Sequence, residues 1–210
     1  MNSIEIKNLN RSFDQGVELF NDFNLNVQAG EKIAIVGSNG SGKTTLLRMM
    51  AGLVLPSSGD ILINGLNTKE SAVEIRKQIG WVPSDENSFF PRLSGYENLI
   101  SFVTAEMTDR ELREKIHKYN KHTIINEVLK RPYYLCSRGM KQILSLLRAL
   151  VTQPKVLILD EPSIGLDENH QKIFLDLINQ DFKDKIMVVA SHDKSITHKF
   201  CDRVITLGEQ

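Results

Sequence analysis

The chain has 210 residues, which is enough for one domain with a sizeable hydrophobic core. Lys and Arg together number 26, as do Asp and Glu, so the formal net charge is zero and no strongly basic surface predicts nucleic acid as a main partner. No apolar run of about 18 residues predicts a membrane span, and the first residues lack the apolar core of a signal peptide.

The two cysteines, Cys136 and Cys201, are distant in sequence and do not form a C-x-x-C pair. We therefore expect reduced thiols in a cytoplasmic protein, and neither a disulfide nor a metal site.

The first elements along the chain are expected to be strands. Apolar residues alternate with polar ones through residues 1–35, as in strands with one buried face. A short apolar strand over residues 32–36 leads into a glycine-rich loop, and residues 44–51 predict the helix that follows it. A strand over residues 59–64 ends in the turn dipeptide Asn64-Gly65.

Helices and buried strands are expected to share the rest of the chain. Residues 68–79 predict a short helix, residues 80–83 a strand, and the apolar spacing between residues 95 and 130 is helical. Residues 156–159 and 186–190 are continuous apolar runs, which are typical of parallel strands buried on both faces, and residues 203–207 predict a final strand.

The glycine-rich loop is a phosphate-binding motif. Its residues, Gly37-Ser38-Asn39-Gly40-Ser41-Gly42-Lys43-Thr44, match G-x-x-x-x-G-K-[ST] at every fixed position, between a predicted strand and a predicted helix. We expect the backbone N–H groups of the loop and the helix N-terminus to bind the phosphates of a nucleoside triphosphate. Lys43 is expected to reach the β- and γ-phosphates and the Thr44 hydroxyl to ligate Mg²⁺, with Thr45 close by.

Two carboxylates follow the apolar run at residues 156–159. Asp160 ends this predicted strand, where it is expected to hold Mg²⁺ through water beside the phosphate loop. Glu161 points elsewhere and is expected to act as general base on the attacking water. The order of elements predicts an α/β fold, with a P-loop NTPase core whose mostly parallel sheet is flanked by helices. An antiparallel β subdomain and a helical subdomain over about residues 87–140 complete one domain spanning residues 1–210.

A short Ser/Gly element, Cys136-Ser137-Arg138-Gly139-Met140, precedes a predicted helix that leads into the strand ending at Asp160. With the phosphate loop upstream, this order resembles the ATPase subunits of ABC transporters over essentially the whole chain. The segments around residues 83 and 140–142 are most similar to ABC-2-type exporter ATPases. Because the chain ends soon after the last predicted strand, we expect no C-terminal regulatory domain.

The resemblance implies that part of each ATP site comes from a second subunit. Ser137 and Gly139 stand in the family's Leu-Ser-Gly-Gly-Gln signature, which caps the γ-phosphate bound to the other subunit of a head-to-tail dimer. Arg138 replaces the first signature glycine, and its side chain either adds a contact or is solvated. Asp167 occupies the family's D-loop, where it links the two ATP sites, and it is also a candidate N-cap for the next helix.

The resemblance also implies a histidine and an aromatic residue at the nucleotide. His192 corresponds to the family's H-loop histidine, which contacts the γ-phosphate and orients water. Phe13 corresponds to the aromatic residue that stacks on adenine, although Phe20 and Phe23 are alternatives. One position departs from the family: Ser84 stands where a glutamine usually meets Mg²⁺ and the attacking water, and either Ser84 or Asp85 could hold the Mg²⁺-bound water instead.

The implied partners are integral membrane transporter subunits, contacted through a groove lined by residues 84–98. A second copy or another ABC ATPase would give a homodimer or pseudo-dimer, at the cytoplasmic face of the membrane and peripheral to it, with export as the expected direction. Two alternatives stay open. One is a soluble ABC ATPase for assembly, of the iron–sulfur scaffold type, and the other is a non-hydrolysing regulator, which Ser84 leaves possible.

Overall fold

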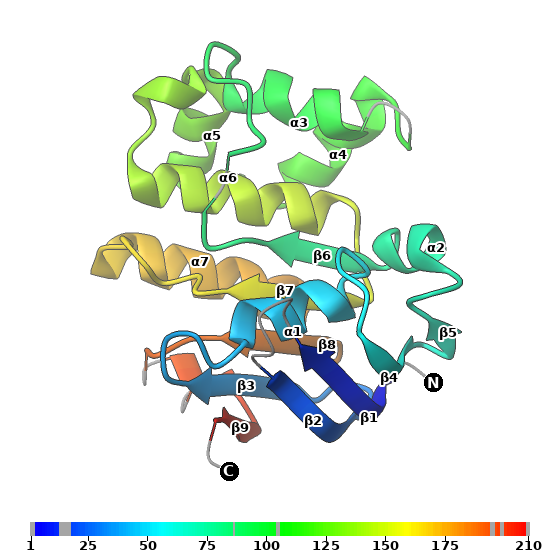
Figure 1. The fold of residues 1–210 in the computed structure, drawn as a ribbon. Helices are drawn as coiled ribbons and strands as arrows, with labels where there is room; N and C mark the ends of the chain where they lie inside the picture. The colour runs from blue at the N-terminus through cyan, green and yellow to red at the C-terminus, as the bar shows by residue number, and fades with distance from the viewer. Residues whose placement is uncertain are drawn as a thin grey trace.

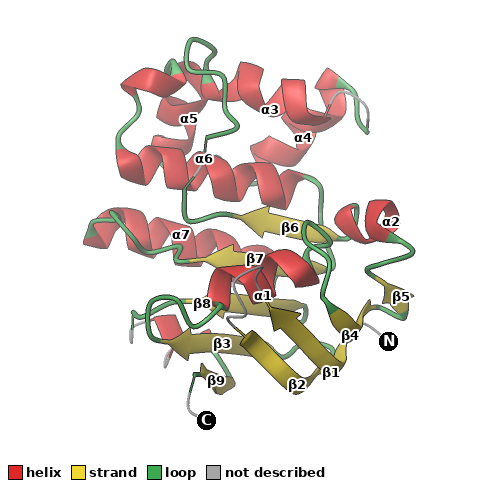
Figure 2. Ribbon diagram, in the orientation of Figure 1, coloured by secondary structure: helices red, strands yellow, loops and turns green. Residues whose placement is uncertain are grey.

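The computed structural model describes residues 3–12, 18–85, 87–103, 106–193, 196–197 and 200–208. Its strands form two sheets, and most of its helices pack over the parallel one (Figures 1 and 2). None of the helices in these ranges is long and apolar enough to cross a membrane.

The smaller sheet is antiparallel, with strand order β2-β1-β4-β5. Its strands are β1 (Ile4–Ser12), β2 (Glu18–Val27), β4 (Ser58–Ile63) and β5 (Leu66–Asn67). The expected turn joins β4 to β5: Asn64 and Gly65 have φ values of 53° and 82°, which is the backbone that a two-residue hairpin of type I′ needs.

The larger sheet is parallel throughout, with strand order β6-β7-β8-β3-β9. Its strands are β3 (Lys32–Gly37), β6 (Ile79–Val82), β7 (Val156–Asp160), β8 (Ile186–Ala190) and β9 (Arg203–Leu207). Every residue of β7 and β8 is buried, which confirms that their continuous apolar runs are strands covered on both faces.

The strands β7 and β8 supply both halves of the core. Leu157 and Met187 join one hydrophobic cluster, while Ile158 and Val188 join the other. Successive side chains of a strand point to opposite faces, so two cores form on the two sides of one sheet. The sheet is therefore fixed in position, and the loops at the carboxyl ends of its strands have a rigid base.

Helices cover the sheet and form a separate layer above it (Figure 1). The helix α1 (Lys43–Met50) follows β3, α2 (Ala72–Arg76) precedes β6, and α7 (Glu168–Asp181) follows β7. The helix α6 (Arg138–Val151) packs against β6 on one side and against α3, α4 and α5 on the other. These three are α3 (Gly95–Val103), α4 (Asp109–His117) and α5 (Thr123–Lys130), and a 3-10 turn, η1 (Tyr133–Leu135), leads into α6.

A buried asparagine organises the entry into the helical layer. The side-chain amide of Asn98 donates to the carbonyls of Phe90, Leu93 and Ser94, and its oxygen accepts from the N–H of Phe90 at 2.7 Å. Asn98 is fully buried, so the polar groups of its own side chain depend on these bonds. The segment before α3 is thus held without secondary structure of its own.

Candidate functional site

The phosphate loop connects β3 to α1 and has the backbone of an anion cradle. Gly40 and Gly42 have φ values of 86° and 93°, a region that L-residues rarely adopt. A Cβ on Gly42 would lie 2.9 Å from the Phe20 ring, whereas a Cβ on Gly40 would meet nothing within 4 Å. The Ser41 hydroxyl is buried and has no hydrogen-bond partner among the described residues. Open space beside Gly40 and an orphaned hydroxyl fit a loop that closes around a ligand.

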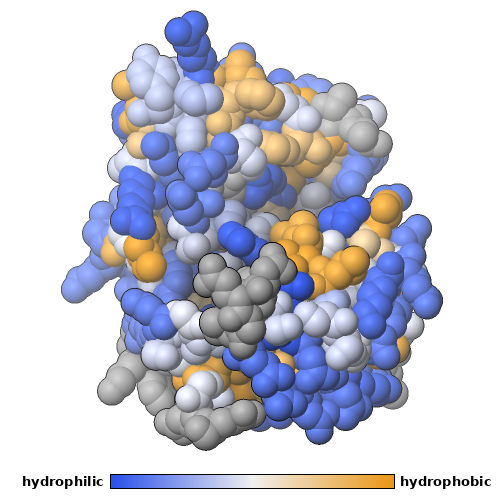
Figure 3. Space-filling model, in the orientation of Figure 1, coloured by the Kyte–Doolittle hydropathy of each residue, from blue (hydrophilic) through white to orange (hydrophobic). Residues whose placement is uncertain are grey.

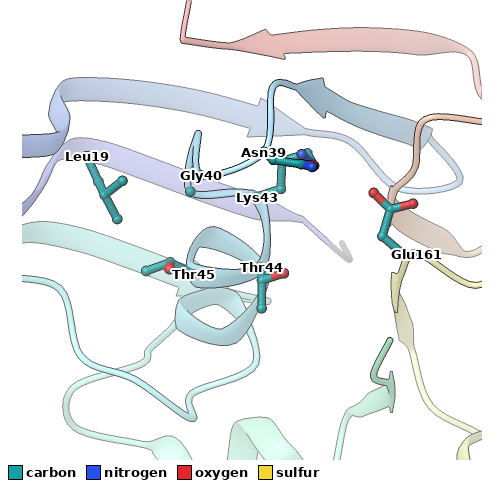
Figure 4. Close-up of a pocket in the computed structure, with 8 residues that line it drawn as sticks. Leu19, Asn39, Gly40, Lys43, Thr44, Thr45 and Glu161 are labelled. Carbon is teal, nitrogen blue, oxygen red and sulfur yellow. The ribbon is translucent and has the colours of Figure 1, made fainter. Parts of the chain in front are cut away.

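Lys43 is buried at the base of this loop. Its ammonium donates to the carbonyl of Gly37 at 2.8 Å and to that of Ser38 at 3.0 Å. The loop borders a cavity of about 430 Å³ (Figure 4), and most of its lining comes from residues that the sequence predicted. The lining residues are Leu19, Asn39, Gly40, Gly42, Lys43, Thr44, Thr45 and Glu161.

A cluster of oxygen atoms lies beside the loop. The Thr44 hydroxyl donates to both carboxylate oxygens of Asp160, at 3.1 and 2.9 Å, and the Ser84 hydroxyl donates to one of them at 3.3 Å. Asp160 is 1% exposed, and this burial raises the pKa of its carboxyl group, while the bonds from Thr44 and Ser84 oppose the rise. Hydroxyl and carboxylate oxygens are the ligands that Mg²⁺ prefers, so these residues fit that ion.

Ser84 is the one of the two open candidates that reaches this cluster. The Asp85 carboxylate instead accepts from the side chain of Asn87 at 2.9 Å. The substitution of serine for the usual glutamine therefore still leaves a hydroxyl against Asp160.

Glu161 lies on the other side of the cavity. Its φ of 47° is unusual for a residue other than glycine, and such a backbone costs of order 1 kcal/mol. This bend follows β7, and the side chain of Glu161 points toward the phosphate loop (Figure 4). The Asp160 carboxylate instead accepts from the Thr44 hydroxyl. The Nε2 atom of His192 lies 3.5 Å from a carboxylate oxygen of Glu161, so the structure brings both predicted catalytic residues together.

The signature residues and the D-loop lie outside this cavity. The Ser137 hydroxyl accepts from the N–H of Met140 at 3.2 Å, which makes Ser137 the N-cap of α6. Asp167 is the N-cap of α7, as predicted, because its carboxylate accepts from the N–H of His170 at 2.8 Å. This bond is the main reason that the pKa of Asp167 is lowered. Neither these residues nor Gly139 line the phosphate-loop cavity.

His170 received no role from the sequence, yet it joins these two elements. Its Nδ1 atom lies 2.7 Å from the second carboxylate oxygen of Asp167. A Cβ on Gly139 would lie 2.8 Å from the same imidazole ring, so the ring fills the space that the glycine leaves. The contact joins two helices far apart in sequence, and no local pattern could have predicted it.

The assignment of an aromatic residue to the adenine stays a prediction. Phe13 lies outside the described residues. Phe20 is buried and packs against Gly42, and the centroids of the Phe20 and Phe23 rings are 5.6 Å apart. Phe20 is therefore part of the hydrophobic core behind the phosphate loop. Leu19 lines the cavity and was not predicted, although the alternation of side chains along β2 places it opposite Phe20.

Both cysteines are free thiols, as the sequence predicted. Burial raises the pKa of Cys136, and it raises the pKa of Cys201 to about 11. Neither thiol belongs to the cavity beside the phosphate loop.

Comparison with known proteins gives one consistent result. Residues 20–164 match the family described as ABC transporter. A putative ABC transporter ATP-binding protein of Clostridium acetobutylicum is 33% identical over 215 residues, which span 100% of this chain and 77% of that protein. The spermidine/putrescine import ATP-binding protein PotA of Fusobacterium nucleatum is also 33% identical, over 98% of this chain and 54% of its own length.

Solved structures show the same similarity in three dimensions. The ATP-binding cassette MJ0796, determined as a dimer in a post-hydrolysis state bound to ADP and Pi, superposes with a TM-score of 0.83 at 25% identity. That match covers 97% of this chain and 94% of the cassette. The cbiO1 protein of Clostridium perfringens, part of the ABC transporter complex cbiONQ, has a TM-score of 0.83 at 31% identity, over 98% of this chain and 84% of that one.

Proposed function

Because the chain belongs to the ABC transporter family of ATPases, which bind ATP and Mg²⁺, we propose that it hydrolyses ATP within a dimer and thereby drives separate membrane subunits. The observation that carries the proposal is the convergence of Thr44, Asp160 and Glu161 beside the phosphate loop. A hydroxyl and a carboxylate for a hard cation, with a second carboxylate facing the loop, are the groups that triphosphate hydrolysis requires.

Each residue of this site has one task in the proposed reaction. Lys43 exchanges the carbonyls of Gly37 and Ser38 for the β- and γ-phosphates. Glu161 accepts a proton from the water that attacks the γ-phosphorus in line with the departing ADP, and His192 contacts the γ-phosphate and orients that water. Thr44 and, through water, Asp160 would hold Mg²⁺, which would supply positive charge to the phosphate oxygens.

The second half of each ATP site is assigned to the other subunit of a head-to-tail dimer. In this assignment, Ser137 and Gly139 cap the γ-phosphate of the ATP bound to the other subunit. Neither residue lines the phosphate-loop cavity of its own chain, which agrees with a role across the dimer interface. Asp167 links the two sites beside its role as N-cap of α7. The dimeric state of the similar MJ0796 cassette with ADP and Pi supports this arrangement.

We assign residues 1–210 to a single ATP-binding domain, with a helical subdomain over about residues 87–140. A cavity of about 520 Å³ lies beside β6, and its lining includes Trp81, Phe102 and Leu53. Leu53 is 50% exposed, and Figure 3 shows apolar surface over the loop that follows α1. We extend the docking groove for the membrane subunit from residues 84–98 to this cavity, since exposed apolar side chains favour a protein partner.

We propose export as the direction of transport, because the segments around residues 83 and 140–142 resemble those of ABC-2-type exporter ATPases. PotA is named as an import ATP-binding protein and is 33% identical to this chain, so a relative as similar as the Clostridium acetobutylicum protein serves import. The chain is assigned to the cytoplasmic face of the membrane, where its partner subunits hold it. The similar cbiO1 protein is part of an ABC transporter complex, and this similarity favours a transporter subunit over a soluble assembly ATPase.

Recovery of partners from detergent-solubilised membranes tests the proposal. Tagged Glu161→Gln protein with Mg-ATP should bring down a polytopic membrane protein. Phe102→Ser in the same background should lose that protein, whereas Val204→Ser, which removes a slightly more exposed apolar residue on β9, should retain it. Recovery of a soluble scaffold alone would contradict transport and favour the assembly ATPase.

A further inference from the structure

Arg138 stands at the first turn of α6, and its side chain is held against the loop that follows β7. A Cβ on Gly165 would lie 2.3 Å from Cδ of Arg138 and 2.7 Å from Nε. Gly165 has a φ of 80° and is the residue whose missing side chain leaves room for this stem. Arg138 is an exposed residue, and the aliphatic part of its side chain lies against Gly165.

The turn that carries Arg138 is itself fixed from two sides. Ser137 caps Met140, and Gly139 rests on the ring of His170. That ring is tied in turn to Asp167. The start of α6 and the loop from β7 to α7 consequently form one unit, at the edge of the molecule where the phosphate loop also lies (Figure 1).

The guanidinium of Arg138, in contrast to its stem, has no partner. No hydrogen bond, ion pair or ring contact joins it to any residue in the described part of the chain. It is absent from the lining of the phosphate-loop cavity. A preorganised cation without a counter-charge of its own fits an anion that another molecule brings.

The phosphate-loop cavity of a second copy needs such a cation. Among the described residues that line it, Lys43 is the single base, and it is opposed by Glu161 in the lining and by Asp160 beside it. A bound triphosphate adds further negative charge, which Lys43 and a Mg²⁺ ion together do not balance.

We propose that Arg138 donates to the γ-phosphate of the ATP bound to the opposite subunit and stabilises the charge that develops on it during hydrolysis. The inference rests on the proposed head-to-tail dimer and goes beyond it, because it gives the position of the first signature glycine a charged role. An arginine supplied across an interface to a transferring phosphoryl group is an effective source of such stabilisation.

Two substitutions separate charge from packing. Arg138→Met keeps an apolar stem over Gly165 without charge, whereas Arg138→Lys keeps a charge but loses the planar fork. Lys141→Met is the matched control, because Lys141 is a cation on the same helix whose ammonium already lies 4.9 Å from the centre of the Tyr133 ring. All three are made in the Glu161→Gln background, which slows hydrolysis so that the lifetime of the ATP-bound dimer can be followed by sedimentation after dilution.

Arg138→Met should shorten the dimer lifetime about tenfold or more and weaken its dependence on salt, with Arg138→Lys in between and the control unchanged. The affinity of the separated monomer for a fluorescent ATP analogue should stay the same in every variant. An unchanged lifetime in Arg138→Met, or a shortened one with the full salt dependence retained, would overturn the inference. Failure of the Glu161→Gln parent to dimerise with Mg-ATP would instead refute the proposed dimer.

Discussion

Replacing Gly139 by alanine should push the imidazole of His170 out of its place beneath α6. The new Cβ would lie 2.8, 3.0 and 3.1 Å from three atoms of that ring. Non-bonded carbon atoms are most favourable at about 3.5–4.0 Å, so the ring has to retreat by several tenths of an ångström. It cannot retreat freely, because its side chain is only 16% exposed and its Nδ1 lies 2.7 Å from Asp167.

The expected cost follows from two opposing effects. Overpacking of this kind destabilises a folded protein by about 1–3 kcal/mol. Alanine is favoured over glycine in a helix by up to about 1 kcal/mol, but Gly139 lies in the first turn of α6, where the gain is smaller. The net loss should be about 1–2 kcal/mol, which for a chain of this size lowers the Tm by about 2–8 °C.

Thermal unfolding of Gly139→Ala, His170→Ala and the double variant tests this reasoning. With the ring removed, the alanine at position 139 meets no obstacle, and the same substitution should become neutral or stabilising. The coupling between two residues in contact should then be about 1–3 kcal/mol. If Gly139→Ala costs the same in both backgrounds, the ring is not what excludes the side chain and the packing argument is wrong.

Other substitutions and one titration test separate parts of the structure. Glu161→Gln should keep ATP binding and slow phosphate release by roughly 10²–10⁴, so near-normal turnover would contradict a general base at this position. Lys43→Ala should abolish binding of a fluorescent ATP analogue, and an unchanged affinity would refute the role of the loop. Asn98→Ala removes the acceptor of the Phe90 N–H and the amide that donates to the carbonyls of Phe90, Leu93 and Ser94, so urea unfolding should show a loss of about 2 kcal/mol or more; a loss within 0.5 kcal/mol would show that water replaces these bonds. Because burial raises the pKa of Cys201 to about 11, its labelling by a thiol reagent should rise about tenfold per pH unit from pH 7 to 9, and a plateau in that range would contradict the shift.

The strands and the phosphate loop could be predicted because their signals are local. The continuous apolar runs of β7 and β8 depend on burial at both faces, and the turn at Asn64-Gly65 depends on positive φ values that those two residues tolerate. The loop from Gly37 to Thr44 depends on glycine backbones at fixed spacing. Each of these properties depends on a few consecutive residues, so it can be predicted from the sequence before any tertiary contact is known.

The remaining features of the site depend on contacts between distant segments. Ser84 contacts Asp160 only because β6 and β7 are neighbours in the sheet. The sequence of neither strand alone predicts that they pair. The ring of His170 meets Gly139 only because α6 and α7 pack side by side. The left-handed backbone of Glu161 is held by a bond from its N–H to the carbonyl of Ala190 at 2.8 Å, which again joins two strands.

The central claim is that two copies of this chain, or one copy and a related ATPase, enclose ATP between them. The most direct test is sedimentation of purified Glu161→Gln protein with and without Mg-ATP, beside the double variant Lys43→Ala/Glu161→Gln. The account predicts a monomer without nucleotide, a dimer holding two ATP molecules with it, and no dimer in the double variant. A Glu161→Gln protein that binds ATP and stays monomeric would contradict the claim.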